Sequence, residues 1–521
     1  MDTSTLKGIE KLITNIPGFD HISSGGLPKY RTTLVAGTAG SAKTVFATQF
    51  LAEGVMKSGA HVVFVTFEEP PDDIRNNMVS MGWDIEAWEK QGKWLFVDAS
   101  AQPGEEPLVA GSYDLGALLA RIEYAVKRCQ ADRVSLDSLD AIFTQLPDRA
   151  TVRRELSRIA SALKKMQVTS VMTAERTEEY GDISRYGVEE FVADNVIILR
   201  NVLEEEKRRR TIEILKFRGT IHKKGEHPFT VVPGEGMIAI PLSAIELSQK
   251  SSEIRISSGN AELDVMCGGG FFRDSLVLVS GATGTGKTLI ATEFIAGGLK
   301  SGERALLFAF EESRDQLFRN ASDFGTDFEQ MEKEGKLKVV CTYPDGKGLE
   351  DHLISMNKVL DEFKPDRIVV DSLSALERVS SLRAFREFVI GLASSIKKQQ
   401  IAALFTSTTP AQSAASVTEA HISATTDSII LLRNVEMNGE MRRGLTVLKM
   451  RGSQHDKDIR EFVIDGFGMH IGKPFRNVRG ILAGQPVQVR PGEPDPLPGE
   501  PDPRPGEPDP RPGEPAPRPG E

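Results

Sequence analysis

Short runs of apolar residues, rich in Val, Ile and Leu, alternate along the chain with longer segments that suit helices. A continuous apolar run of about five residues is typical of a strand buried on both faces of a sheet. The pattern predicts helices at residues 45–58 and 289–300. It predicts strands at residues 32–36, 61–66, 169–173, 275–280, 305–309 and 402–406, with two more that end near Asp137 and Asp371.

A further group of apolar runs closes each half of the chain without helices between them. Successive strands of this kind favour an antiparallel extension, whereas strands that alternate with helices form a parallel sheet. The predicted fold is therefore α/β, with a mostly parallel sheet flanked by helices in each half. The late strands are predicted at residues 196–200, 211–216, 229–232, 429–433, 445–449 and 461–464.

The same series of elements occurs twice, and matching segments lie 233 to 244 residues apart. Phe67-Glu68-Glu69 matches Phe310-Glu311-Glu312, and DNVIILRNV (194–202) matches DSIILLRNV (427–435). Because the matches keep their order, we interpret the chain as a tandem of two related domains. We predict these domains at residues 1–245 and 246–485.

The last part of the chain has a different character. From Pro491 the heptad PGEPDPL/R runs four times, and thirteen of these thirty-one residues are proline. The heptad lacks the paired apolar positions of a coiled coil, so we predict an extended, disordered, acidic tail at residues 486–521.

Composition narrows the class of protein. The chain has 521 residues, too many for one core, and only three cysteines, none at metal-ligand or redox spacing. No export signal and no membrane-length apolar run is recognisable, so we expect a cytoplasmic protein. The formal charge is -10, of which the residues from Pro491 onward carry -5, and this weighs against a dedicated nucleic-acid-binding protein.

Two glycine-rich segments suit nucleotide phosphates. Each lies between a predicted strand and a predicted helix, where backbone N–H groups and the positive helix end converge. The loop at 281–288 (GATGTGKT) fits the phosphate-loop pattern fully, whereas the loop at 37–44 (GTAGSAKT) has Ala42 where glycine is usual. The lysines are expected to neutralise ATP phosphates. The predicted ATP contacts are Gly37, Gly40, Ser41, Ala42, Lys43, Thr44, Thr283, Gly284, Thr285, Gly286, Lys287, Thr288 and Leu289.

Carboxylates follow the strands beside each loop. Asp137 and Asp371 close apolar runs, where a carboxylate can hold Mg²⁺ and its water, although an isolated Asp is more often a helix cap. The predicted Mg²⁺ ligands are Thr44, Asp137, Thr288, Glu311 and Asp371. One member of each glutamate pair is the candidate base that activates the attacking oxygen; otherwise these are solvated charges. The pairs are Glu68 with Glu69, and Glu311 with Glu312.

Basic residues recur at a strand end late in each half. Lys216 and Arg218 lie near His222, and Lys449 and Arg451 lie near His455. Such residues either reach the nucleotide of a neighbouring subunit or form an exposed, salt-bridged rim. The spacing leaves both interpretations open.

Several segments resemble the KaiC family of tandem RecA-like ATPases from bacterial circadian oscillators. They are GATGTGKT (281–288), EEYGDISRYGVEEF (178–191), GSQHDKDIREF (452–462) and PFRN (474–477), within a match from about Gly18 to Arg479. The resemblance implies two RecA-like P-loop NTPase domains, ATP and Mg²⁺ as cofactors, and ATP-dependent homohexamers with ATP between adjacent subunits. It implies that the first ring hydrolyses ATP and that the second is a serine/threonine autokinase.

The resemblance also assigns individual residues. Glu68 would be the base for hydrolysis and Glu311 the base for autophosphorylation. The implied contacts to the first-ring nucleotide are Ser80, Lys216, Phe217, Arg218, Thr220 and His222. The implied contacts to the second-ring nucleotide are Phe324, Arg443, Lys449, Met450 and Arg451.

Three departures from the family pattern shape the expected partners. The paired Ser-Thr phosphosite keeps Ser423 but has Ala424, so Ser423 is the expected main phosphosite. Gln454 replaces a family tryptophan, and the proline-rich repeats replace the peptide that KaiA grips. A KaiB-type partner is therefore better supported than KaiA, with a histidine kinase or another signalling protein as an output partner.

The leading interpretation is an ATP-hydrolysing autokinase ring in circadian or related signalling. Two alternatives share the fold, which does not settle function. A RecA/DnaB-like nucleic-acid motor or recombinase would bind single strands in a salt-dependent way. An ATP-ligated ring scaffold would assemble with nucleotide but release no phosphate.

Overall fold

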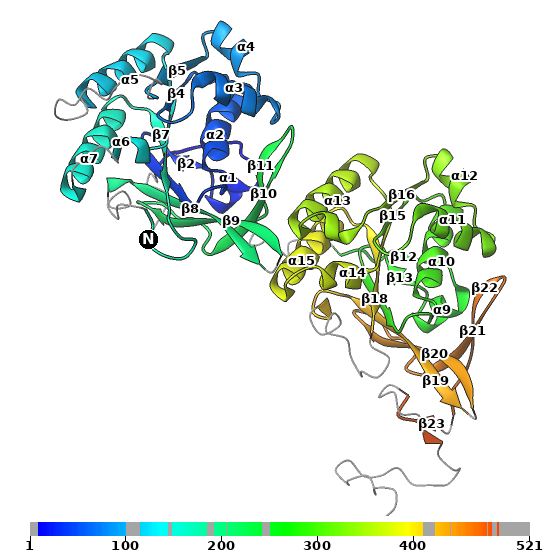
Figure 1. The fold of residues 1–521 in the computed structure, drawn as a ribbon. Coiled ribbons are helices and arrows are strands. Elements are labelled where there is room, and N and C mark those ends of the chain that lie inside the picture. The colour runs from blue at the N-terminus through cyan, green and yellow to red at the C-terminus, as the bar shows by residue number, and fades with distance from the viewer. Residues whose placement is uncertain are drawn as a thin grey trace, which may run out of the picture.

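The computed structural model describes residues 9–100, 115–143, 148–184, 192–204, 206–241, 251–409, 422–437, 439–476, 478–481 and 487–488. Figure 1 shows two lobes of similar architecture, the first coloured blue to green and the second green to orange. Each lobe contains one nine-stranded sheet with helices on both faces, which confirms the predicted α/β class and the tandem arrangement.

The sheet of the first half has the order β11-β10-β9-β8-β3-β7-β6-β4-β5. The central strand β3 is parallel to both its neighbours, and antiparallel pairing begins beyond β8. The strands are β3 (Thr32–Gly37), β4 (Val62–Thr66), β5 (Trp94–Asp98), β6 (Arg133–Asp137), β7 (Thr169–Glu175), β8 (Asn195–Glu204), β9 (Lys207–Phe217), β10 (Glu226–Val232) and β11 (Gly236–Ala239). The helices are α1 (Phe19–Ile22), α2 (Lys43–Ser58), α3 (Pro71–Val79), α4 (Ile85–Lys90), α5 (Leu115–Cys129), α6 (Asp140–Phe143) and α7 (Arg149–Lys165).

The sheet of the second half repeats this order with equivalent strands, as β16-β15-β17-β18-β14-β19-β20-β21-β22. Its strands are β14 (Leu276–Gly281), β15 (Ala305–Ala309), β16 (Leu337–Cys341), β17 (Arg367–Asp371), β18 (Ala402–Thr408), β19 (Ser428–Met437), β20 (Glu440–Met450), β21 (Arg460–Asp465) and β22 (Gly468–Pro474). Its helices are α9 (Ala261–Met266), α10 (Lys287–Lys300), α11 (Arg314–Asp323), α12 (Phe328–Lys333), α13 (Leu349–Phe363), α14 (Leu373–Arg378) and α15 (Leu382–Lys398). Short strand pairs complete the fold: β1 (Lys11–Leu12) with β2 (Leu27–Pro28), β12 (Arg255–Ile256) with β13 (Phe271–Phe272), and β23 (Val478–Arg479) with β24 (Val487–Gln488).

The predicted strands agree with the observed ones to within a few residues. Four strands at the edges of the two sheets, β5, β11, β16 and β22, were not predicted. The late hairpin strands are longer than predicted because polar residues continue the ladder where the apolar run stops. The segment Lys207–Arg210, for example, begins β9. Strand pairing also reaches residues 487–488, inside the segment predicted as a disordered tail; residues 489–521 lie outside the described part of the chain.

The central strands and the helices that follow them are deeply buried. Every residue of β3 and β14 is buried, and apolar clusters cover both faces of each sheet. Burial along α2 and α10 fixes the first turn of each helix against the sheet, which gives the preceding loop a rigid base. No helix in the described ranges is long and apolar enough to cross a membrane.

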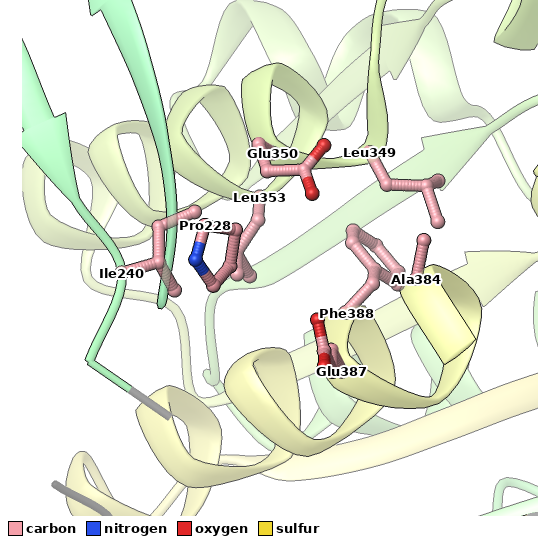
Figure 2. A pocket seen from close by; sticks show the side chains of 8 residues that line it. All are labelled: Pro228, Ile240, Leu349, Glu350, Leu353, Ala384, Glu387 and Phe388. Carbon is pink, nitrogen blue, oxygen red and sulfur yellow. The ribbon is translucent and has the colours of Figure 1, made fainter. Parts of the chain in front are cut away.

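The two halves meet where β9 and β10 pack against α13 and α15. Figure 2 shows an apolar pocket there, with Pro228 and Ile240 from the first half facing side chains of both helices. Beside it, Arg209 is buried, with its Nε 2.8 Å from Glu350, and it also pairs with Glu387. Thr230 donates to Asp351 across the same boundary at 2.6 Å.

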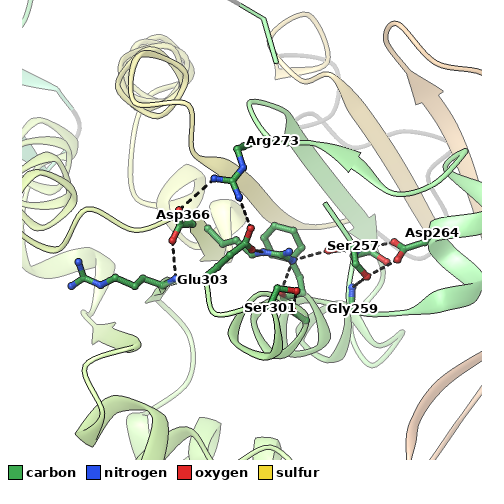
Figure 3. Close-up of polar contacts among 12 residues, drawn as sticks. Ser257, Gly259, Asp264, Arg273, Ser301, Glu303 and Asp366 are labelled. Carbon is green, nitrogen blue, oxygen red and sulfur yellow. Dashed lines mark hydrogen bonds and ion pairs between the residues drawn. The ribbon is translucent and has the colours of Figure 1, made fainter. Parts of the chain in front are cut away.

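A buried arginine at the start of β6 and β17 is held differently in the two halves. Arg367, only 1% exposed, pairs with Glu303, which also accepts from Arg273 at 2.7 Å. Figure 3 shows Arg273 reaching both Glu303 and Asp366.

The matching Arg133 is equally buried, but its guanidinium donates to the carbonyls of Phe50 and Ile13. Ala60 stands at the position of Glu303, two residues after the matching serine that ends each helix.

Candidate nucleotide sites at two phosphate loops

Both predicted phosphate loops leave a central strand and enter a buried helix. The first follows β3 and leads into α2 at Lys43, and the second follows β14 and leads into α10 at Lys287. Lys43 Nζ lies 3.0 Å from the carbonyls of Gly37 and Thr38. Lys287 Nζ makes the matching contacts to Gly281 and Ala282, so the two lysines close their loops in the same way.

The backbone at the last position before the lysine differs between the loops. Gly286 has φ +103°, and Ala42 adopts a left-handed conformation at φ +71°. A residue with a Cβ in this region costs of the order of 1–3 kcal/mol. The first loop therefore keeps the phosphate-loop shape in spite of its alanine, and this strain requires support from the surroundings.

A threonine and an aspartate lie together beside each loop. Thr288 donates to Asp371 at 2.8 Å, and Thr406 donates to its other oxygen. Burial raises the pKa of Asp371, and the two hydroxyl donors oppose that rise.

In the first half, burial likewise raises the pKa of Asp137, opposed by hydrogen bonds from Thr173 and Thr44. Carboxylate and hydroxyl oxygens suit Mg²⁺, which needs only one or two protein ligands besides water and phosphate oxygens. The Thr44–Asp137 and Thr288–Asp371 pairs therefore fit the predicted metal. Glu311, also predicted as a ligand, accepts from Ser372 and Arg378 instead.

The two glutamate pairs lie just beyond β4 and β15, next to these aspartates. Ser138 donates to Glu68 at 3.0 Å and Ser372 donates to Glu311 at 2.8 Å, so a serine orients the first glutamate in each pair. Glu311 additionally pairs with Arg378. Thr144 stands at the position that matches Arg378 in the first half and cannot supply a charge there.

The second glutamate of each pair lies close to the aspartate, Glu312 half-buried and Glu69 exposed. Burial raises the pKa of Glu69, and the neighbouring charge of Asp137 raises it further. Burial and the charge of Asp371 act in the same way on the pKa of Glu312. Their side chains contact amides on the next helix, Asn77 at 3.4 Å and Asn320 at 3.2 Å.

The late basic residues lie toward the edge of the sheet opposite their own phosphate loop. Phe217 pairs with Asn195, which is level with Thr33 near the start of β3, whereas the loop leaves the far end of β3 at Gly37. At about 3.3 Å per residue this level is roughly 13 Å short of the loop. Met450, through Ser428 and Val277, has the equivalent place in the second half.

A bulge precedes the basic residues at the same place in each half. The ladder between β8 and β9 shifts so that Leu215 is unpaired, and the ladder between β19 and β20 shifts at Leu448. These leucines are 44% and 50% exposed. A bulge turns the side chains that follow it, and it thereby sets the direction of Lys216 and Lys449.

At this edge the basic residues hold the turn before the next strand. Lys216 donates to the carbonyl of Ala193 at 2.9 Å. Arg218 lies 3.8 Å from Asp194, and Arg451 lies 3.7 Å from Asp427. These ion pairs agree with the interpretation of the basic residues as a salt-bridged rim.

Lys449 donates to the carbonyls of Ser423 at 2.6 Å and Thr426 at 2.8 Å. Ser423 is half-buried in a turn that precedes β19, and Asp427 N donates to the carbonyl of Leu276 at the start of β14. Glu311 lies beyond the opposite end of the sheet, about five residues or roughly 17 Å further along. Glu311 and Ser423 of one chain are therefore not brought together.

The other predicted contacts are spread over both edges. Arg443 pairs with Asn434, just past the end of β14, on the side of its own loop. Phe324 ends α11 and packs against the apolar core. In the first half Ser80 ends α3, and its hydroxyl donates to Asn77. The remaining two, Thr220 and His222, follow β9.

Comparison with known proteins settles the family. The family model "ATPase: KaiC" matches residues 12–243 and again residues 256–475. This chain belongs to the KaiC family. The two matches fall on the two sheets, so each lobe is a KaiC-type, RecA-like ATPase domain.

Named relatives extend over nearly the whole chain. "Circadian clock protein KaiC3" of Synechocystis sp. is 69% identical over 93% of this chain and 96% of its own length. "Circadian clock oscillator protein KaiC 1" of the same organism is 53% identical over 93% of each chain. The KaiC of Parathermosynechococcus lividus is 53% identical over 95% of this chain and 92% of its own length. These matches support the circadian KaiC interpretation and do not favour a nucleic-acid motor.

The structure adds site residues that the sequence analysis missed. Ser138 and Ser372 orient the glutamates, and Thr173 and Thr406 bind the aspartates. The duplication carried a usable signal, because each hydroxyl residue recurs at the matching position of the other half. Glu179, whose carboxylate accepts from the loop residue Thr38 at 2.6 Å, has no such counterpart; it lies in the family-like segment 178–191, but nothing there marked it as a partner of the loop.

Proposed function

We propose that this chain is an ATP-dependent ring-forming enzyme that hydrolyses ATP at its first site and phosphorylates Ser423 from its second. The observation that carries the proposal is the placement of each phosphate loop and its basic residues toward opposite edges of one sheet. A complete site then needs the loop of one chain and the basic residues of the next. A closed ring of identical chains supplies this contact at every junction, in keeping with the expected homohexamer.

At the first site, Lys43 leaves the loop carbonyls for the β- and γ-phosphates, and Thr44 with Asp137 would hold Mg²⁺. The metal supplies charge neutralisation on the phosphates when bound. Glu68, oriented by Ser138, accepts a proton from the water that attacks the γ-phosphorus. Lys216 and Arg218 of the adjacent chain stabilise charge on the transferred group.

At the second site the attacking oxygen is the hydroxyl of Ser423 from the adjacent chain. Glu311 accepts the hydroxyl proton, the serine oxygen bonds to the γ-phosphorus, and the bond to the leaving oxygen breaks, giving phosphoserine and ADP. Arg378, which pairs with Glu311, lies within reach of the new phosphate at this carboxylate. Ala424 offers no hydroxyl, so the two-acceptor cycle of the family has one acceptor fewer.

Mixed assembly tests this proposal. Chains carrying Glu311→Gln are combined with chains carrying Ser423→Ala under conditions that allow exchange, and Mg·ATP is added. Glu311→Gln alone should leave Ser423 unlabelled, and Ser423→Ala alone should give no label in this segment because it lacks the acceptor. The mixture should give phosphoserine at Ser423 of the Glu311→Gln chain, detected by phosphopeptide mapping of an isotope-marked chain.

Three outcomes would count against the proposal. Label on Ser423 in Glu311→Gln alone would exclude Glu311 as the base. If the unmodified protein released phosphate but gave no labelled peptide around Ser423, it would be an ATPase without autokinase activity. Assembly with ATP but no phosphate release would identify the scaffold alternative. A KaiB-type partner and a cytoplasmic location belong to the same proposal and follow from the family.

A further inference from the structure

The outer side of the first phosphate loop is tied to the sheet by contacts that have no equivalent at the second loop among the described residues. Thr38 donates its hydroxyl to Glu179 at 2.6 Å. The other oxygen of Glu179 accepts from the backbone N–H of Asn201 on β8 at 3.0 Å. Arg210 donates to the carbonyl of Gly40 at 3.3 Å. The Glu179 carboxylate thus joins the loop to β8, although Glu179 is 141 residues from Thr38 and 22 residues from Asn201 in sequence.

The segment that presents Glu179 is itself firmly held. Arg176 donates to the carbonyls of Gly181 and Asp182 at 3.1 Å. Arg200 donates to the carbonyl of Glu179 at 3.2 Å. Both arginines are buried, and a buried guanidinium with several acceptors has little freedom to move. Glu179 is therefore an anchored group.

The second loop cannot make this tether. Ala282 stands at the position of Thr38, and a methyl group donates no hydrogen bond. By the offset that aligns Asn201 with Asn434, the position of Glu179 is taken by Gln412, which lies outside the described residues. A Cβ on Gly40 would meet Asn201 at 3.2 Å, whereas one on Gly284 would meet nothing within 4 Å among the described residues.

We propose that Glu179 is a positioning residue of the first nucleotide site, which holds the loop through Thr38 in the shape that binds phosphate. The strain at Ala42 makes this support necessary. When only a fraction of molecules has the competent loop, the apparent dissociation constant rises by the inverse of that fraction. The inference rests on the proposed function only in assigning the first loop to ATP.

The test measures nucleotide affinity in the full chain with the second site disabled by Lys287→Ala. A fluorescent ATP analogue with Mg²⁺ is titrated into the Thr38→Val, Thr38→Ser and Glu179→Gln variants of this background. Valine keeps the shape of threonine without a donor, serine keeps the hydroxyl, and glutamine keeps one acceptor oxygen but loses the charge. Glu178→Gln is the matched control. Glu178 is exposed, and its substitution removes the same charge from the same segment.

We expect Thr38→Val to bind the analogue about tenfold more weakly, equal to about 1.4 kcal/mol. Thr38→Ser and Glu178→Gln should stay within about twofold of the background, and Glu179→Gln should fall between. Turnover at saturating ATP should be unchanged in Glu178→Gln, the control outside the tether. A purely structural role would instead lower the unfolding temperature equally in Thr38→Val and Thr38→Ser.

Two results would overturn the inference. Thr38→Val with background affinity would show that the tether does not shape the loop. Tighter binding in Glu179→Gln would show that its charge only repels phosphate. Because affinity is read without turnover, absence of ATP hydrolysis in the unmodified protein would count against the proposed function and leave this comparison intact.

Discussion

The two nucleotide sites share one frame but differ in which of their parts is fixed. In the first half the phosphate loop is tethered through Thr38, and no arginine stands at the place of Arg378. In the second half the loop has glycine at the strained position, and the candidate base Glu311 is paired with Arg378. Hydrolysis needs only a water at the γ-phosphate, whereas transfer must admit a segment of another chain. The comparison indicates that the duplicated halves kept the phosphate loop with its lysine and aspartate, and came to differ in the groups around the candidate base.

The largest expected effect separates the sites by their role in assembly. Lys43→Ala removes the phosphate contact of the tethered loop, and we expect a folded, largely monomeric protein with ATP present. Lys287→Ala, the matched change in the second half, should retain rings because the first site still bridges adjacent chains. Light scattering with Mg·ATP measures both. Rings of normal abundance in Lys43→Ala would break the proposed division between the halves.

A second effect separates hydrolysis from transfer. General-base catalysis typically contributes about 10²–10⁴-fold, so Glu311→Gln should abolish Ser423 phosphorylation over hours while most phosphate release continues. Glu68→Gln should do the reverse, with the loss in free phosphate. Parallel assays of phosphate and phosphopeptides on the same samples provide the measurement. Equal losses of both products in one variant would show that the two sites do not work separately.

A third, smaller effect concerns stability at the buried arginines. Glu303→Gln leaves Arg367 and Arg273 without their shared carboxylate, and breaking such a pair costs about 3 kcal/mol. The unfolding transition of the second half should fall by several degrees. Ala60 occupies the matching place in the first half, so Ala60→Gln is the control for introducing an amide there.

Replacing Glu53, which lies near Arg133, should have the opposite effect on stability from replacing Glu303. Burial raises the pKa of Glu53 above its unfolded value. Its contribution to stability is therefore present below the unfolded pKa and is lost as the pH rises through the folded pKa. At neutral pH the charged form is a cost, and Glu53→Gln should leave the first half equally stable or slightly more stable. A clear loss of stability in that variant at neutral pH would contradict this sign.

The smallest expected effect lies outside both halves. Truncation after Arg490 removes the proline-rich repeats, which have too few apolar residues to bury surface in exchange for their ordering entropy. Melting temperature and ring size should be unchanged. A drop in either would mean that the repeats dock on one half, and the comparison of the two halves would then need to include them.

Much of this architecture could be predicted from sequence because the signals are local. The apolar runs gave the strands, and the motifs after β3 and β14 gave the loops that bind phosphate. The sheet edge at which the late basic residues lie could not be predicted, because it depends on which strands pair and in which register. The Glu179–Thr38 bond joins residues 141 apart, and no pattern within either segment marks the partner. The pairing of Arg378 with Glu311 likewise depends on the fold, because the two residues are 67 apart in sequence.

The bulge before Lys216 and Lys449 bears on the ancestry of the protein. An unpaired leucine occurs at the same step of the same hairpin in both halves. Inheritance from one ancestral domain explains this shared irregularity more simply than two independent insertions. The ancestor therefore already turned its lysine toward the far edge of the sheet. In that single-domain ancestor the lysine already lay away from its own phosphate loop, so this separation preceded the gene duplication.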